Sequence, residues 1–275
     1  MRTKLMGLAI LATLVVSVAA VPDSAGAAGN KVKFEGLKVK RGGIQRSALK
    51  RAPKKGRLTG IKKFFGRFKK VNRMQHSLMP TRTGDVRVFD LEMSAGATRS
   101  KGLLTQRVGE VRVEHGVLRA QVAQTWESDG HSNTTNHVQE VGRQGVLMTT
   151  AEKLDHPPAV QVHTTGVGLP KKMKVGQTWT NTQRWTQEGA VVEAHTTGRV
   201  LRKVRRQGPD RKMHDGFEIE TVTRSTTTFN GEKHPSTHVM RSVYLKGIGE
   251  VESTSQVKEH DSTVTRRMIG FTPGE

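Results

Sequence analysis

The sequence predicts an all-β protein: one curved antiparallel sheet, as a half-barrel or a sandwich, with a disordered basic N-terminal arm and one short amphipathic helix. From Asp85 onward, apolar residues recur at every second position, which is the period of a β-strand. Turn signals separate these stretches at short intervals and no long helical pattern intervenes, so a βαβ architecture is not expected. Aromatic residues make up 4% of the chain, so the core must consist mainly of Val, Leu, Ile and Met.

The N-terminus has the pattern of a secretory signal peptide. Two basic residues precede an almost continuous apolar run from Leu5 to Val18, and small residues follow. The run is shorter than the ~20 residues that span a bilayer, although an uncleaved anchor is the alternative interpretation. Cleavage after Ala20 and cleavage after Ala27 both fit this pattern.

The chain has no cysteine. This excludes a lipid-modified N-terminal cysteine, disulfide bonds and Cys-ligated zinc. We therefore expect an exported bacterial protein that is periplasmic or extracellular. Its expected parts are a signal peptide at 1–27, a basic arm at 28–75 and an antiparallel β domain at 76–275.

Charge separates the basic arm from the β domain. The whole chain has a net charge of +22, with 46 Lys and Arg against 24 Asp and Glu. Between positions 31 and 75 there are 17 Lys and Arg and one acid, whereas residues 76–275 have a net charge of only +5. A localised basic segment suits contact with anionic surfaces, and a near-neutral body suits a scaffold or container. Lys31 to Lys55 has no hydrophobic period and too few apolar residues to order itself.

Residues 60–72 predict a short amphipathic helix at the end of the arm. One helical face would hold the apolar residues Ile61, Phe64, Phe65, Phe68 and Val71. Two interpretations stay open: the helix packs this face on the β domain, or it lies on an anionic membrane or glycolipid surface. In the second case the docking residues are Lys62, Lys63, Phe64, Phe65, Arg67, Phe68, Lys69 and Lys70.

The first half of the β domain predicts strands near 86–89, 111–114, 118–126, 138–150 and 160–165. His115-Gly116 predicts a tight hairpin turn between two of these strand segments. On the strand that follows, one face holds Leu118, Ala120, Val122, Gln124 and Trp126. Gly130 to Asn136 predicts a polar loop, and His156-Pro157-Pro158 predicts a rigid break.

The second half predicts strands near 178–186, 191–204, 217–229, 238–245, 250–258 and 263–271. Asn230-Gly231 is a strong hairpin signal, and Gly198 suggests a turn or bulge. Many of these strands are rich in Thr, which suits a strand with one face in water. Gly-Glu-Val recurs at 109–111 and 249–251, which suggests two related halves with a break near 156–170.

Two local motifs predict sharp corners in the sheet. In the segment from Leu169 to Trp179, Pro170 and Gly176 bracket a turn that leads into a strand. In the segment from Tyr244 to Val251, two glycines allow a corner or a bulge. A sheet that curls around its own core needs such corners.

This pair of motifs resembles exported bacterial proteins of unknown function that have an L-P-x-x-x-G-x-x-W turn and a Y-x-x-G-[IV]-G-x-V corner. Trp179, Tyr244, Gly247 and Gly249 match the pattern, and the resemblance covers about residues 165–260. Those families look like relatives of periplasmic lipoprotein carriers, whose fold is a curved antiparallel half-barrel around an apolar cavity. The resemblance implies a fold and carries no catalytic role.

The sequence contains no catalytic or cofactor motif: no nucleophile elbow, P-loop, dinucleotide fingerprint or HExxH. His131 and His137 flank the expected polar loop near Asp129, where a metal site is the alternative to the solvated loop that we favour. The neighbouring His-Asp pairs at 214–215 and 260–261 would point to opposite faces of a strand. We therefore expect no cofactor, no metal and no enzyme, and a secreted hydrolase is the least favoured alternative.

We expect a non-catalytic binding or carrier protein of the bacterial envelope, with an apolar cavity for a lipid-like ligand. The residues expected to line this cavity are Trp126, Trp179, Trp185, Phe217, Ile219 and Phe229. The alternative is that these side chains fill a solid core in a structural or protein-interaction module. The basic arm suits an anionic lipid or glycolipid surface better than nucleic acid, because nucleic acid is scarce where exported proteins act. The sequence indicates neither the ligand's identity nor the oligomeric state.

Overall fold

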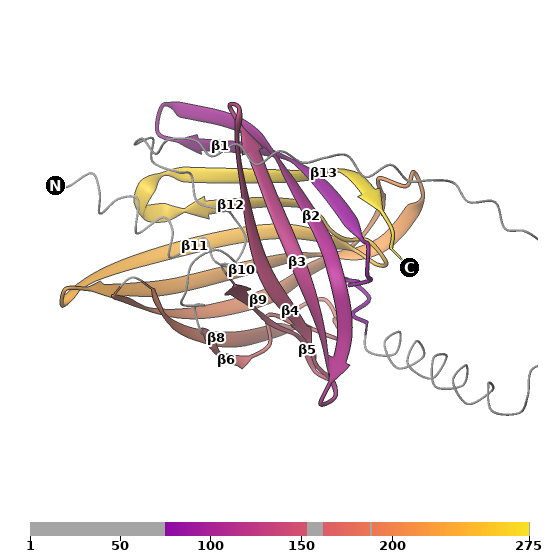
Figure 1. The fold of residues 1–275 in the computed structure, drawn as a ribbon, viewed down its shortest axis with the longest axis horizontal. Coiled ribbons are helices and arrows are strands. Elements are labelled where there is room, and N and C mark those ends of the chain that lie inside the picture. The colour runs from indigo at the N-terminus through magenta and orange to yellow at the C-terminus, as the bar shows by residue number, and fades with distance from the viewer. Residues whose placement is uncertain (1–74, 153–161, 188, 275) are drawn as a thin grey trace, which may run out of the picture. The chain divides into compact units, whose positions relative to one another are not determined.

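The computed structural model describes residues 75–152, 162–187 and 189–274, which form one body of antiparallel strands (Figure 1). The expected all-β class and curved antiparallel sheet are confirmed (Figure 1). The signal-peptide pattern, the basic arm, the docking helix expected at 60–72 and the Pro157-Pro158 break lie outside the described residues.

The strands from residue 178 onward match the predicted stretches. The first five strands are β1 (Val86–Ala95), β2 (Thr98–Glu114), β3 (Val117–Ser128), β4 (His131–Val141) and β5 (Gly145–Glu152). In this first half, the single strand expected at 138–150 is divided between β4 and β5, and the strand over 98–110 was not predicted. Two short strands follow, β6 (Val162–Gly166) and β7 (Leu169–Pro170). The remaining strands are β8 (Thr178–Gln187), β9 (Ala190–Gln207), β10 (Met213–Phe229), β11 (Glu232–Leu245), β12 (Gly249–Val257) and β13 (Ser262–Thr272). A 3₁₀ turn, η2 (Lys258–His260), separates β12 from β13.

All thirteen strands belong to one sheet, in the order β6-β8-β9-β10-β11-β12-β13-β1-β2-β3-β4-β5-β7. Strands next to each other in sequence are mostly next to each other in the sheet, because tight turns connect them. The predicted turns at His115-Gly116 and Asn230-Gly231 are confirmed: all four residues have positive φ, as this type of two-residue hairpin requires. β13 pairs with β1, so the last strand joins the two halves of the sheet.

The two edges of the sheet are joined by a short piece of chain. β6 pairs with β8 at one edge, and β7 pairs with β5 at the other. Between them, the Gly168 amide donates a hydrogen bond to the Val146 carbonyl (2.8 Å), and the Trp179 indole N–H donates to the Gly168 carbonyl (3.0 Å). We call residues 166–171 the clasp. Because the clasp contacts both edges, the sheet curls back on itself.

The register of the strands defines the buried face of the sheet, which we call the inner face. One row of directly paired residues crosses six strands on this face: Val200, Ile219, Ser242, Ser253, Arg266 and Leu91. All six residues are buried. The row is apolar at both ends and polar in the middle, so the inner face is not uniformly apolar.

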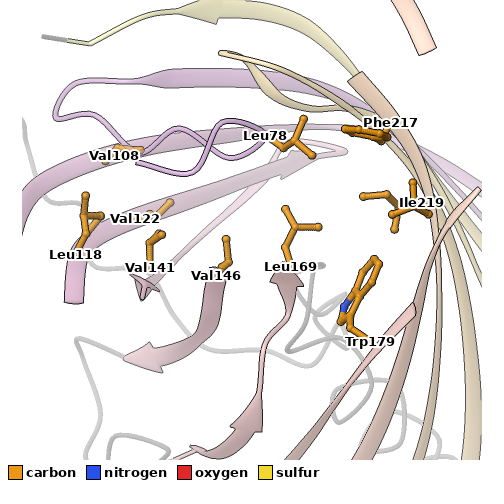
Figure 2. Close-up of a cluster of buried hydrophobic side chains, with 12 residues drawn as sticks. Leu78, Val108, Leu118, Val122, Val141, Val146, Leu169, Trp179, Phe217 and Ile219 are labelled. Carbon is orange, nitrogen blue, oxygen red and sulfur yellow. The ribbon is translucent and has the colours of Figure 1, made fainter. Parts of the chain in front are cut away.

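Apolar side chains from opposite parts of the sheet meet in a cluster that we call the packed core (Figure 2). Its members are Leu78, Val108, Leu118, Ala120, Val122, Val141, Val146, Leu169, Trp179, Val200, Phe217 and Ile219. In Figure 2, Leu78 and Leu169 lie between the side chains of β3–β5 and those of β8–β10. The segment before β1 and the clasp therefore fill this end of the curled sheet. A second cluster contains Phe89, Leu91, Leu104, Trp126, Val243, Leu245, Ile248 and Met268.

A buried histidine holds the segment before β1 against the clasp. The Leu78 amide donates to Nδ1 of His76 (3.2 Å), which leaves the Nε2–H to donate to the Pro170 carbonyl (2.9 Å). Burial lowers the pKa of His76, which favours this neutral form.

A buried ion pair joins the two ends of the β domain. Asp85 is fully buried, and its carboxylate pairs with the Arg87 guanidinium at 3.1 Å. The same carboxylate accepts a hydrogen bond from the Gly274 amide (2.7 Å). Arg87 also donates to the carbonyls of Pro80 and Ile248. Its charge and its donors are therefore both satisfied inside the fold.

The prediction of a polar loop at Gly130 to Asn136 is wrong. His131–Val141 forms strand β4, and the turn before it is Asp129-Gly130, with positive φ at both residues. The first four residues of β4 are exposed, so polar side chains are compatible with a strand there. Composition alone suggested a loop, but pairing with β3 determined the structure.

The prediction of a turn or bulge at Gly198 is also wrong. β9 runs through this position without interruption, and its extra residue is Leu201. A Cβ atom at position 198 would lie 2.2 Å from the Trp179 ring, so glycine is needed for that ring to pack on the strand.

The repeated Gly-Glu-Val tripeptide lies at two bulges. The register shifts between Val108 and Val111 in β2, and again where Val251 is the extra residue in β12. Gly247 and Gly249 both have positive φ, which confirms the predicted corner between β11 and β12. The repeat therefore marks two places where the sheet bends.

Candidate functional site

Beyond the packed core, the inner face of β8–β13 is lined by polar residues. The buried ones are Asn181, Gln183, Thr196, Thr223, Ser225, Thr227, His238, Ser242, Ser253, Ser255 and Arg266. The register places them side by side: Asn181, Thr196, Thr223 and His238 are directly paired across four neighbouring strands. We call this surface the polar inner face. Several Thr residues that we expected to face water are therefore buried.

Five buried polar atoms on this face have neither a hydrogen-bond nor an ion-pair partner within the part of the chain that the structure describes, and a sixth, His234 Nε2, has only Glu232 at 3.8 Å. The five are Asn181 Oδ1, Trp185 Nε1, Ser225 Oγ, Ser236 Oγ and Ser242 Oγ. A buried polar atom without a partner costs about 1–3 kcal/mol, so folded proteins keep few of them. These five atoms on β8, β10 and β11 are atoms to which a bound molecule can supply hydrogen bonds.

Arg266 and Glu250 are the charged groups of this region. Arg266 pairs with Glu250 at 2.7 Å and donates from Nε to the Ser253 hydroxyl at 3.0 Å. The Tyr244 hydroxyl donates to the second Glu250 oxygen at 3.1 Å. Burial, followed by the charge of Glu250, raises the pKa of Tyr244, so this hydroxyl stays protonated. The charges compensate each other, and the face is polar without a net charge.

Two histidines on the inner face are neutral at ordinary pH. His238 contacts the Ser255 hydroxyl, and burial, together with the charge of Arg266, lowers the pKa of His238 to about 4. His137 pairs with Val122 across β3 and β4, and burial lowers the pKa of His137 to about 4. These groups act as neutral hydrogen-bonding partners above that pH.

The structure brings three of the six predicted cavity residues together. Trp179, Phe217 and Ile219 lie in the packed core (Figure 2). Trp126 belongs to the second cluster. Trp185 is buried but lies in neither of these two clusters, and Phe229 is partly buried at the end of β10. The aromatic residues therefore do not form one group.

The polar inner face was not predicted from the sequence. A signal was present, because Thr223, Ser225 and Thr227 continue the spacing of two that begins with Phe217 and Ile219. Residues at that spacing share one face of a strand, so the apolar part of the pattern indicated the position of the polar part.

The first motif forms the clasp and the strand that receives it. Leu169 is in the packed core, and the Gly176 amide donates to the Val200 carbonyl at 2.9 Å. Five residues separate Pro170 from Gly176, against three in the pattern that this segment resembles, so the turn is longer here. The resemblance to carrier-like families stays a prediction.

In the described ranges, no three His, Asp or Glu side chains converge as a metal site would require. His131 lines an open surface pocket of about 510 Å³ at the β2–β3–β4 end, with Lys101, Gly102, Leu103, Glu127, Ser128, Asp129, Gly130 and Ser132. None of the six predicted cavity residues lines it. The described part of the chain has no helix with the length and apolarity needed to cross a membrane.

No protein-family model matches the chain, and no curated protein matches it significantly. Among solved structures, a candidate exported protein with a YmcC-like fold from Bacteroides fragilis matches with 13% identity and a TM-score of 0.48. This match covers 71% of this chain and 98% of that one. A candidate lipoprotein from Parabacteroides distasonis matches with 11% identity and a TM-score of 0.46, over 72% of this chain and 99% of that one. The hypothetical lipoprotein YmcC from Escherichia coli matches with 12% identity and a TM-score of 0.31, over 81% and 100%.

Proposed function

We propose that this chain is an exported, non-catalytic binding or carrier protein of the bacterial envelope, and that its inner face takes a lipid-like ligand. The observation that carries the proposal is the group of five buried polar atoms without partners on β8, β10 and β11. A ligand with hydroxyl or amide groups would satisfy these atoms and recover the free energy that their burial costs.

Apolar residues interleaved with these atoms favour an amphiphile over a purely polar ligand. In the paired rows of β9 and β10, Ala194 is opposite Ser225 and Val192 is opposite Thr227. Trp185 lies beside Val192 in the same row. A purely apolar ligand would leave the polar atoms unpaired, whereas an amphiphile can place its polar group among them and its apolar part on Trp185.

Export rests on the signal-peptide pattern at the N-terminus. The basic arm complements this location, because anionic lipids give envelope surfaces a negative potential.

The test is native mass spectrometry and organic extraction of the mature chain purified after export. We expect a lipid to co-purify, and we expect Ser225→Phe to displace it by filling the inner face. Thr226→Phe is the matched control, because residue 226 points to the opposite face of the same strand. A second variant, Ser225→Ala, removes the hydroxyl without adding volume and should weaken lipid binding without blocking the inner face. The proposal is wrong if the wild-type chain carries no lipid and takes none from a bacterial lipid extract.

The packed core favours a second candidate, a solid-core structural or protein-interaction module. Trp179, Phe217 and Ile219 pack with nine other buried apolar residues instead of lining an open space. This candidate predicts that Ser225→Phe and Thr226→Phe leave the composition of the organic extract unchanged.

A further inference from the structure

The near-neutral β domain contains a local concentration of positive charge. Residues 201–215, the end of the β9–β10 hairpin, hold six Lys and Arg and two Asp. Residues 76–275 together have a net charge of +5, so this hairpin end carries most of it. The positive charge of residues 201–215 was not singled out in the sequence, because the basic arm holds far more Lys and Arg.

Ion pairs neutralise one face of this hairpin end. Arg202 pairs with Glu218 at 2.6 Å, and Arg206 pairs with Glu252 at 2.7 Å. Asp210, the acid of the turn, contacts His214 at 2.9 Å.

The other face keeps its charge. Within the described residues, Lys203, Arg205, Arg211 and Lys212 form no ion pair, and all four are exposed. Asp215 is directly opposite Arg205 on this face, so four cations stand against one acid. Lys203 and Arg205 share a face of β9, and the turn adds the other two cations. Met213 is paired with Gln207 on this same face and is 55% exposed. We call Lys203, Arg205, Arg211, Lys212 and Met213 the hairpin surface.

We propose that the hairpin surface docks on an anionic lipid bilayer. Four cations against one acid on this face supply the electrostatic attraction to such a surface. The exposed Met213 between them favours a bilayer over a soluble polyanion, because an apolar side chain gains from entering the lipid interface. The proposal does not depend on the ligand of the inner face or on the basic arm.

The absence of cysteine makes a position-specific test available. Met213→Cys in the mature chain is labelled with a polarity-sensitive fluorophore and mixed with phosphatidylglycerol–phosphatidylethanolamine vesicles. Leu103→Cys is the control, because Leu103 is 39% exposed on β2 and is paired with Asp90 and Glu127. We expect a blue shift and protection from an aqueous quencher at position 213 alone, reversed by high salt and absent with phosphatidylcholine vesicles.

Charge variants separate docking by the hairpin from attraction by the whole chain. Lys203→Gln, Arg205→Gln, Arg211→Gln and Lys212→Gln together should weaken protection at position 213 by at least about tenfold. The matched control removes four exposed cations elsewhere: Arg99→Gln, Arg107→Gln, Arg143→Gln and Lys233→Gln. Equal loss in both sets would overturn the proposal, as would an unshifted label at 213 on a chain that sediments with the vesicles. If heparin protects the label at position 213 as well as the vesicles do, the hairpin surface binds polyanions in general and the bilayer proposal is wrong.

Discussion

Trp179 and Trp185 lie on the same face of β8, yet their surroundings differ. The Trp179 indole donates to the Gly168 carbonyl, and its ring packs where Gly198 leaves space. Trp185 is also buried, but its indole N–H has no partner in the described part of the chain. One strand therefore passes from a packed core to a polar surface within six residues.

The difference shows that burial and apolar packing are separate properties in this sheet. The clasp and Leu78 fill one end with apolar side chains. The rest of the β8–β13 inner face is buried but keeps hydroxyl and amide groups, which lower stability unless a ligand or water pairs with them. Mutations of similar size should therefore have unequal effects in the two regions.

The largest effect is expected at the buried ion pair beside the packed core. Asp85→Ala leaves the Arg87 charge without its partner and should lower the free energy of unfolding by about 3–5 kcal/mol. Glu218→Ala is the control, because its partner Arg202 is largely exposed and the expected loss is below about 1 kcal/mol. Urea unfolding followed by tryptophan fluorescence measures both. Similar losses in the two variants would contradict the role given to Asp85.

Ile219 and Ser242 compare the two regions directly, because they are paired across β10 and β11. Ile219→Ala removes packed-core contacts and should cost about 2–5 kcal/mol. Ser242→Ala removes a hydroxyl without a partner and should change stability by less than about 1 kcal/mol. A large loss for Ser242→Ala in the same urea assay would mean that its hydroxyl is paired in solution.

Acid should destabilise the fold through the neutral histidines of the inner face. The pKa of His238 falls from 6.5 to about 4 on folding, so the unfolded chain binds more protons between these values. The stabilisation is complete above pH 6.5 and is lost as the pH falls toward 4. The loss is at most roughly 3 kcal/mol for this residue. His238→Gln should flatten the dependence of the unfolding midpoint on pH, whereas an unchanged slope would show that other groups cause it.

The smallest predicted difference is between the two tryptophans. Trp179→Phe leaves the Gly168 carbonyl without its donor and should cost about 1–3 kcal/mol. Trp185→Phe removes an N–H without a partner and should cost less. Thermal unfolding of the two variants, followed by circular dichroism, compares them under one condition. Equal losses of stability in the two variants would contradict the distinction between the packed core and the polar inner face.

Turns and alternation were predictable from sequence because their signals are local. Asn230-Gly231 and His115-Gly116 specify hairpins by the φ values they allow, and the strands followed from spacing. The segment at 130–136 was mispredicted because cross-strand pairing outweighed its polar composition. Gly198 was misinterpreted because its reason is a tryptophan on the neighbouring strand.

The candidate site was less predictable than the fold, because it depends on which parts of the sheet face each other. Trp126 and Trp179 both lie in strands of alternating apolar and polar residues, yet the structure places them in different apolar clusters. Ser225 and Ser242 resemble exposed strand residues in sequence, and only the curl of the sheet buries them. The charge of 201–215 was present in the sequence but was small beside that of the arm.

The pairing of β1 with β13 has a consequence for the order of assembly. The first long strand of the sheet obtains its second neighbour only after the last strand has been synthesised. Asp85 likewise waits for the amide of Gly274. Pairing across such a sequence separation is slow to form, so the middle of the sheet is completed last. A ribosome-bound chain that still lacks β13 therefore cannot complete this fold.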